Sequence, residues 1–274
     1  MTTARSALFA LAGTACAGGA TPLSNLEPAL PTTVRYAPHQ AAYIAVSNGR
    51  QDQQVPGGAI TTEFGFRVYL NTVVDQGPER LQITILVDSV PQASGVSIPL
   101  SDLPRVSGTT FTGGVAGTGE VLGLSGGDTT ISLVRQLHQA FEEFLPPIPE
   151  LGAEPGAAWI DTATSRTQNA GMEIEIVSVG THEVVGWTDY AGLEALHITT
   201  RSEYTLSGQG SQMGQAITID GTGIREEHSY LSANGMYLGG WAADSSNMNA
   251  LLSSVGMAVP IIQVRNDSLI YRPR

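Results

Sequence analysis

The sequence predicts a mainly β protein, built on a large antiparallel sheet with one long amphipathic helix. From about residue 34 to 90 and from about 172 to 271, segments rich in β-branched and aromatic residues are separated by short turns. Asn234-Gly235 lies between two such segments and is a strong hairpin signal. The one clear helical signal is the apolar spacing between residues 128 and 145.

The predicted helix has one broad apolar face. Seven side chains fall on that face: Ile131, Leu133, Val134, Leu137, Phe141, Phe144 and Leu145. Asp128 is the expected N-cap, and Pro146-Pro147 is expected to end the helix. A helix with so many apolar side chains must bury them, so we expect the sheet to cover this face.

The segments around the helix add more specific expectations. Residues 60–74 and 81–90 should pair as a hairpin, because a Gly-Pro turn separates them. Trp159 is expected to fill the junction between helix and sheet. Residues 247–255 are expected to form a second, short helix. Residues 34–274 are predicted to be a single β-rich domain.

The charge balance bears on the class of partner. The chain of 274 residues contains 25 Asp and Glu but only 13 basic residues, all of them Arg, and its net charge is −12. Phosphate binding needs a concentrated basic surface, so this composition argues against a nucleic-acid partner. Five scattered histidines, with no ligand spacing, no phosphate loop and no nucleophile motif, give no reason to expect a metal, a cofactor or catalysis.

The N-terminus has the pattern of an export signal. A short apolar run follows Arg5 and ends in small residues before Cys16, so residues 1–15 are predicted to be a signal peptide. Residues 16–33, rich in Gly and Pro, are predicted to be the modified N-terminus and a flexible tether. An ordinary cleaved signal, with a secreted or surface-exposed product, and a cytosolic protein are the alternatives.

Gly13-Thr14-Ala15-Cys16 resembles the lipobox of bacterial lipoproteins, in which the cysteine carries the lipid. This resemblance implies lipid attachment at Cys16 and membrane association through the lipid alone. Ala17 then favours an outer-membrane lipoprotein that faces the periplasm. Together with the tether, the meander and the helix, this start resembles exported lipoproteins with an unclosed β-barrel, such as the lipoprotein-localisation carriers.

The resemblance implies a large curved sheet or unclosed barrel, with the helix at about 128–145 packed on its concave face. It leads to our first functional prediction, a lipid-anchored periplasmic protein that binds a hydrophobic or amphiphilic ligand between helix and sheet. The candidate ligand-binding residues are Phe141, Phe144, Leu196, Ile198, Tyr204, Glu226, His228 and Tyr230.

Glu226 and His228 share their strand face with Tyr230, and this face can point inward or into solvent. If it points inward, the carboxylate and the imidazole could bind a ligand or act as an acid–base pair in a hydrolase. The other prediction is a structural or assembly lipoprotein of the cell envelope, which binds protein partners and has no small ligand.

Overall fold

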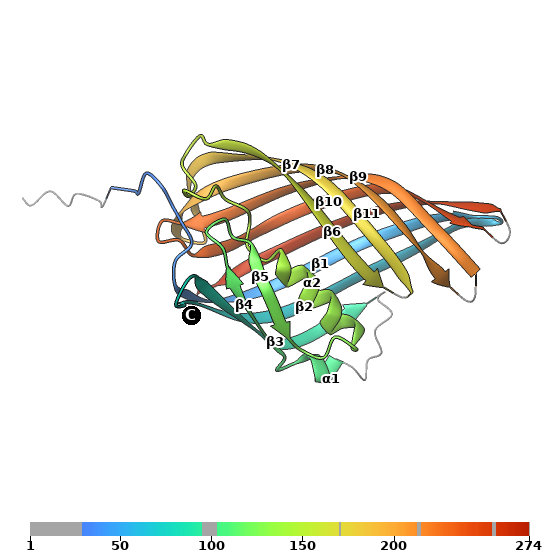
Figure 1. The fold of residues 1–274 in the computed structure, drawn as a ribbon, viewed down its shortest axis with the longest axis horizontal. Coiled ribbons are helices and arrows are strands. Elements are labelled where there is room, and N and C mark those ends of the chain that lie inside the picture. Colours follow the sequence, from blue (N-terminus) through green and yellow to red (C-terminus); the bar gives the residue numbers. More distant parts are fainter. Residues whose placement is uncertain (1–28, 95–102, 170, 213–214, 254–255, 274) are drawn as a thin grey trace, which may run out of the picture. The chain divides into compact units, whose positions relative to one another are not determined.

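The computed structural model describes residues 29–94, 103–169, 171–212, 215–253 and 256–273. Residues 31–274 form one compact unit, most of which is a single antiparallel sheet of eleven strands (Figure 1). The prediction of a mainly β protein with one large antiparallel sheet is confirmed. Cys16 and the rest of residues 1–28, on which the predicted signal peptide and most of the tether fall, lie outside the described residues.

The strands are long, and two helices interrupt them. In chain order the elements are β1 (His39–Val55), β2 (Gly58–Gln76), β3 (Leu81–Ser94), α1 (Leu103–Val106), β4 (Thr110–Val115), β5 (Val121–Gly126), α2 (Ser132–Glu142), β6 (Ala158–Asn169), β7 (Met172–Tyr190), β8 (Leu193–Gln212), β9 (Gln215–Ser232), β10 (Tyr237–Leu252) and β11 (Met257–Arg272). Their order across the sheet is β5-β4-β3-β2-β1-β11-β10-β9-β8-β7-β6.

Two meanders make up this sheet, and β1 and β11 join them. β1 pairs antiparallel with β11, so Ala42 lies opposite Arg272 and Gln53 lies opposite Ile261. β5 and β6 form the two edges, so the sheet is not closed. The predicted hairpin corresponds to β2 and β3, and Asn234-Gly235 lies in the turn between β9 and β10.

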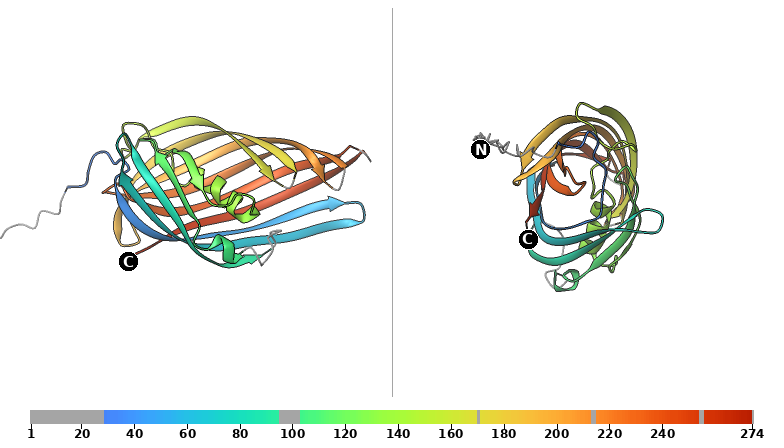
Figure 2. Two further views of the ribbon diagram at one scale, coloured as in Figure 1. Left: turned by 60° about the horizontal axis from the view of Figure 1, so that its bottom comes forward. Right: turned by 90° about the vertical axis from the view of Figure 1, so that its left-hand side faces the viewer.

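Viewed along the strands, the sheet curls, and α2 lies inside the curl (Figure 2). The chain enters α2 from one edge strand, β5, and leaves toward the other, β6. The helical segment therefore occupies the space between the two edges and covers part of the sheet's inner face.

The helix is shorter than predicted, since it spans Ser132–Glu142 rather than residues 128–145. Asp128 does not cap it. The Asp128 Oδ1 atom accepts a hydrogen bond from the backbone N–H of Thr130, while Ile131 is the N-cap residue and makes no side-chain cap. Aspartate often forms such local side-chain-to-backbone turns, which compete with helix formation. At the other end, Glu143 is the C-cap residue.

The predicted apolar face is nevertheless buried along its whole length. All seven side chains, from Ile131 to Leu145, are at most 8% exposed. The ring of Phe144 contacts those of Tyr43 and Tyr237 at centroid distances of 5.7 and 6.1 Å, and Phe141 contacts Phe111 at 5.2 Å. We call this region, where the helical segment and the inner face of the sheet pack together, the packed end.

The prediction of a second helix at residues 247–255 was wrong for its described part, and residues 254 and 255 lie outside the described residues. Residues 247–252 belong to β10, where Asn247 lies opposite Ile262 and Met248 lies opposite Ile261. Pairing with β9 on one side and β11 on the other gives this segment two ladders of backbone hydrogen bonds. Such tertiary pairing overrides a weak local helical preference.

Candidate polar site on the inner face

The strand register divides the inner face into bands. Residues directly opposite each other in neighbouring antiparallel strands point to the same face, so each set of opposing residues forms a row across the sheet. At the packed end the rows are apolar. Three rows further along the strands are mostly polar, and we call them the polar band. Its polar side chains are Asp161, Ser202, Arg225, Asp244 and Arg265 in the central row, with His182, Thr200, Glu227, Asp267 and Ser47 on one side and Ser178, Tyr204, Ser246, Gln263, Gln51 and Thr62 on the other.

Beyond the polar band the rows become apolar again. We call this region the distal apolar band, and its side chains are Ile174, Ile176, Leu206, Ile219, Met248, Val259 and Ile261. Leu206, Val259 and Ile261 are 6–8% exposed, although they do not belong to the main hydrophobic core. Along one strand the inner face thus changes from apolar to polar and back to apolar.

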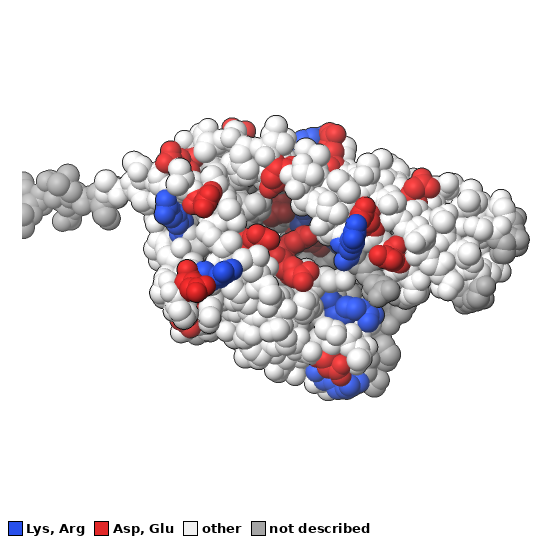
Figure 3. Space-filling model, viewed as in Figure 1, with Lys and Arg blue, Asp and Glu red and all other residues white. Residues whose placement is uncertain are grey.

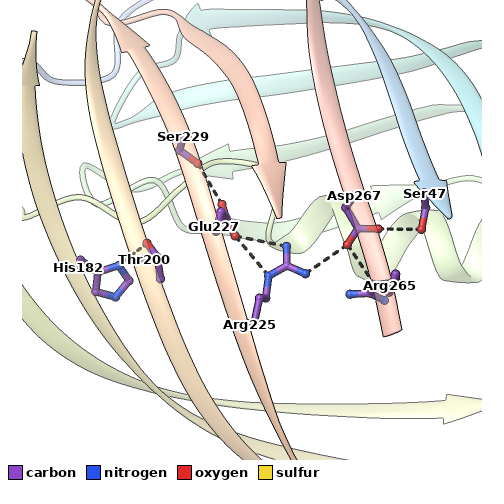
Figure 4. A network of polar contacts seen from close by, with 8 residues as sticks. All are labelled: Ser47, His182, Thr200, Arg225, Glu227, Ser229, Arg265 and Asp267. Atoms are coloured by element: carbon purple, nitrogen blue, oxygen red, sulfur yellow. Dashed lines mark hydrogen bonds and ion pairs between the residues drawn. The ribbon is translucent and has the colours of Figure 1, made fainter. Parts of the chain in front are cut away.

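Arg225 is the centre of an ionic network in the polar band (Figure 4). Its Nη1 atom donates to Asp267 Oδ2 at 3.2 Å, and its Nε and Nη2 atoms both donate to Glu227 Oε2 at 3.3 Å. Arg265 contributes a second guanidinium, whose Nε atom lies 3.0 Å from Asp267 Oδ2. The network therefore links β9 with β11 across β10.

Two serine hydroxyls complete the network. Ser47 Oγ donates to Asp267 Oδ1 at 2.7 Å, and Ser229 Oγ donates to Glu227 Oε1 at 3.0 Å, so every oxygen of these two carboxylates has a partner. Burial by itself would lower the pKa of Arg225, but the nearby carboxylates, Glu227 first, raise it. The guanidinium of Arg225 is therefore held in its charged form.

The charged side chains of the network remain accessible to solvent. Arg225, Glu227 and Asp267 are 25–31% exposed, and Arg265 is 37% exposed, whereas the inner-face residues Leu196 and Leu231 at the packed end are fully buried. In the space-filling view the surface is hollowed between the positions of α2 and β6, and acidic side chains prevail around the hollow (Figure 3). The charged centre of the polar band is thus partly accessible to solvent, whereas its members Ser47, His182, Asp244 and Ser246 are buried.

Glu143, directly after α2, faces this network from the helical side. Burial raises the pKa of Glu143, the guanidinium groups of Arg225 and Arg265 oppose the shift, and Glu227 adds to it. Within the described part of the chain, no side chain hydrogen-bonds or ion-pairs with the Glu143 carboxylate. The Glu143 side chain is exposed to solvent, yet the raised pKa means that its ionised form is disfavoured, as is common for groups in binding clefts.

Two aromatic rings lie against the inner face beside the ionic network. A Cβ atom on Gly223 would come within 2.2 Å of Tyr204 Cζ, and one on Gly49 within 2.2 Å of Phe64 Cζ, so each ring covers a glycine. Tyr204 also donates a hydrogen bond to Asp244 Oδ1 at 2.9 Å, and burial together with this carboxylate raises the pKa of Tyr204 to about 12. Because one face of each ring lies on the sheet, the other is turned toward the hollow.

His182 forms the end of the polar band near the edge strand β6. Its Nδ1 atom lies 2.9 Å from Thr200 Oγ1, and its Nε2 atom lies 3.1 Å from Asp161 Oδ1. Trp159 stacks on the imidazole at a centroid distance of 4.9 Å and also contacts the hydrophobic core. Trp159 thus lies where the packed end meets the polar band.

The eight predicted ligand-binding residues do not form one site. Phe141, Phe144, Leu196 and Ile198 are packed in the hydrophobic core, and only Tyr204 lies in the polar band. Glu226, His228 and Tyr230 are on the outer face, since their neighbours Arg225, Glu227 and Ser229 face inward.

The two members of the predicted acid–base pair share the outer face of β9 but interact with other residues. Glu226 forms an ion pair with Arg201, while His228 Nδ1 lies 2.8 Å from His197 Nε2. His228 also stacks on Trp241 at 4.1 Å, and Tyr230 stacks on Tyr190 at 3.8 Å. The outer face therefore carries an aromatic stack.

Sequence reasoning did not identify the residues that form the polar band, Arg225, Glu227, Asp244, Arg265 and Asp267 among them. One signal was available for four of them. Arg225 and Glu227 alternate in phase with the apolar residue Leu231, and Arg265 and Asp267 alternate in phase with Leu269. Alternation alone could not show which face of the strand points inward, because the other face carries the apolar residues Ile224 and Tyr230.

No known protein-family model matches the chain, and no curated protein is similar to it in sequence. Among the described residues, no helix is long and apolar enough to cross a membrane. No group of three or more His, Cys, Asp or Glu side chains in the described ranges is arranged to hold a metal ion. The geometry of the polar band is therefore the basis for a functional proposal.

Proposed function

We propose that the protein binds an amphiphilic small molecule on the inner face of its sheet, with the polar group of the ligand against the polar band. The apolar part of the ligand would lie along the distal apolar band. The observation that carries this proposal is the change from accessible charged rows to apolar rows along the same strands. A concave surface with apolar walls and a few converging polar groups is the usual form of a ligand site.

The energetics also favour a binding role for the polar band. Replacing a recessed ionic network with apolar packing is often neutral or stabilising, so the network of Arg225, Glu227 and Asp267 is not needed for stability alone. The distal apolar band supplies the complementary affinity, because burying hydrocarbon contributes about 0.8 kcal/mol per CH₂. A ligand with both kinds of group would use both bands.

The proposed ligand does not lie at the interface between helix and sheet. That interface is filled by side chains such as Leu133, Phe141 and Phe144, which are at most 8% exposed. At the end of α2, in contrast, Glu142 and Glu143 are exposed to solvent. The helical segment then acts as a fixed wall of the site.

Two measurements test the proposal. Organic extracts of the purified protein should contain an amphiphile that mass spectrometry detects, and a dodecyl-chain detergent should bind with one-to-one stoichiometry by calorimetry. Met248→Gln, in the distal apolar band, should weaken that binding. Val264→Gln is the matched control, because Val264 is 45% exposed on the outer face of the adjacent strand. Equal affinities for the two variants, or no binding at all, would refute the proposal.

The second candidate function is a structural or assembly role in the cell envelope. It is favoured by β6, an edge strand whose Ile160 is 70% exposed, beside Val179 of β7, which is 48% exposed. An accessible edge with apolar neighbours can pair with a strand of another protein. Crosslinking in native envelopes tests this role, and recovery of free monomer alone would count against it.

We further propose that the mature chain is anchored to a bacterial membrane by a lipid on Cys16, facing the periplasm. The support is the lipobox-like sequence Gly13-Thr14-Ala15-Cys16. The intact mass of the mature protein tests this directly. A mass without the lipid would remove the anchor from the proposal and leave the ligand site unaffected.

A further inference from the structure

The charges that surround the hollow are unbalanced. The polar band and the adjoining helix end carry five carboxylates but only two guanidinium groups. The carboxylates belong to Asp161, Glu227, Asp244, Asp267 and Glu143, and the guanidinium groups to Arg225 and Arg265. Even with both arginines fully charged, the field in the hollow is negative. Because the walls exclude part of the solvent, screening there is weaker than on an open surface.

Both guanidinium groups already lie next to carboxylates, which disfavours an anionic ligand. Arg225 uses Nε, Nη1 and Nη2 on Glu227 and Asp267. Arg265 forms an ion pair with Asp267 through Nε, and its charge also interacts with Glu143, but its two terminal nitrogens make no hydrogen bond within the described residues. An anion would therefore have to displace carboxylates from Arg225, and at Arg265 it would meet the charges of Asp267 and Glu143.

The carboxylates of Glu143 and Asp244, in contrast, have oxygen atoms without a hydrogen-bond partner in the described residues. Glu143 has no hydrogen-bonding or ion-pairing partner in the described residues, and Asp244 accepts only through Oδ1, from Tyr204. Glu143 comes from the end of α2 and Asp244 from β10, so these acceptors approach the hollow from two elements. The negative end of the helix macrodipole adds to the field near Glu143.

The two rings on the inner face are an independent indication of the same ligand chemistry. Tyr204 reaches over Gly223 and Phe64 reaches over Gly49, so the rings approach from opposite sides the strands that carry Asp244 and Arg265. Aromatic faces attract cations, and ammonium groups are commonly recognised by rings combined with carboxylates. An anionic group would gain nothing from these ring faces.

From the free carboxylate oxygens of Glu143 and Asp244 and the two rings on the inner face, we infer that the polar group of the ligand is a cation of the alkylammonium class. This inference rests on the proposed function, because it specifies the ligand of the same site. The cation would lie between Glu143, Asp244 and the ring of Tyr204, and its alkyl chain would extend along the distal apolar band.

The test compares three amphiphiles that share a dodecyl chain and differ only in their polar group. Dodecyltrimethylammonium, dodecyl maltoside and dodecyl sulfate are titrated into the full chain by calorimetry, below their micelle concentrations. We expect the cation to bind about tenfold more tightly than the sulfate, with the maltoside between them. Tighter binding of the maltoside or the sulfate would overturn the inference and leave the proposed function standing. Absence of binding by all three would overturn both.

Variants show whether this preference arises in the hollow. Glu143→Gln should lower the affinity for the ammonium amphiphile about fivefold and leave that for the maltoside unchanged. Glu63→Gln removes the same charge from the outer side of β2, so it controls for the net charge of the protein. Equal effects of the two substitutions would mean that the cation responds only to net charge, and the inference would be wrong.

Discussion

The packed end and the polar band belong to the same strands, yet their side chains have opposite character. On β1, Tyr43 is 1% exposed and lies in the hydrophobic core. Ser47 lies further along the same strand and donates a hydrogen bond to Asp267. On β9, Leu231 is fully buried, while Glu227 is a quarter exposed. The strands continue without a break between the two regions.

What separates the two regions is the helical segment. α2 and residues 143–148 provide a second apolar layer at the packed end, and α2 ends at Glu142. Where that layer is present, the inner face is apolar and dry. Directly beyond this layer, in the polar band, the inner face carries charged side chains that remain partly accessible, and the distal apolar band follows. The length of a short helix thus determines how much of the sheet is core and how much is available for binding.

The largest expected effect would come from breaking the packed end. Phe141→Ala removes a ring that contacts Phe111 and Phe144, so we expect a loss of about 3 to 5 kcal/mol in the free energy of unfolding. Urea denaturation measures this loss. Ile160→Ala is the control on the outer face, where a change within about 0.5 kcal/mol is expected. Similar values for the two variants would mean that the helical segment is not part of the core.

A smaller effect is expected from the centre of the polar band. Asp267→Asn removes the charge shared by Arg225 and Arg265, and partial solvent exposure limits the expected loss to about 1 to 2 kcal/mol. Glu175→Gln, which breaks the exposed pair with Arg166, should cost less than about 0.5 kcal/mol. If Asp267→Asn destabilised as strongly as Phe141→Ala, the polar band would have to be regarded as core.

At the boundary between the packed end and the polar band, Glu143 makes the stability of the protein depend on pH. The pKa of Glu143 is raised from 4.5, so the folded chain binds this proton more tightly than the unfolded chain, and stability falls as the pH rises through the folded pKa. Glu143→Gln should therefore be at least as stable as the parent at neutral pH and lose this advantage below the unfolded pKa.

Urea denaturation at a series of pH values measures the Glu143 effect. Glu142→Gln is the neighbouring control, because Glu142 is exposed and lies 3.7 Å from His138. A gain in stability at neutral pH for Glu142→Gln alone would contradict the assignment of the cost to Glu143.

The smallest expected effect is on the outer face, which neither region includes. Burial and the neighbouring His228 lower the pKa of His197 from 6.5, so the folded chain resists protonation and loses stability as the pH falls through and below that value. His197→Phe should make this part of the pH profile flatter while keeping a ring in the stack. NMR titration of His197 measures the shift itself, and a pKa above 6.5 would contradict the direction.

The sheet and the buried face of the helix could be predicted because they depend on periodicity. The seven apolar positions from Ile131 to Leu145 follow helical spacing, and all seven are buried. The helix ends could not be placed in the same way, because Asp128 forms a local turn with Thr130. For residues 247–252 the decisive interactions are strand pairings with β9 and β11, which local sequence does not reveal.

The polar band could not be predicted because both faces of β9 carry apolar residues. Tyr230, which belongs to the outer aromatic stack, makes its face of the strand as apolar in sequence as the face that carries the buried Leu231. Arg225 and Asp267 are 42 residues apart, and only the order β9-β10-β11 brings them together. Predicting such a network requires the register of three strands in addition to the pattern within one.

The pairing of β1 with β11 also has a consequence for the order in which the chain folds. During synthesis β1 can pair with β2 at once, but its other side must wait for β11, the last of the described strands to be made. Contacts between positions as distant as Ala42 and Arg272 form slowly, because a long stretch of chain must first be ordered. Until then the first meander has an unpaired edge along β1, and the strand that covers this edge also completes the ionic network.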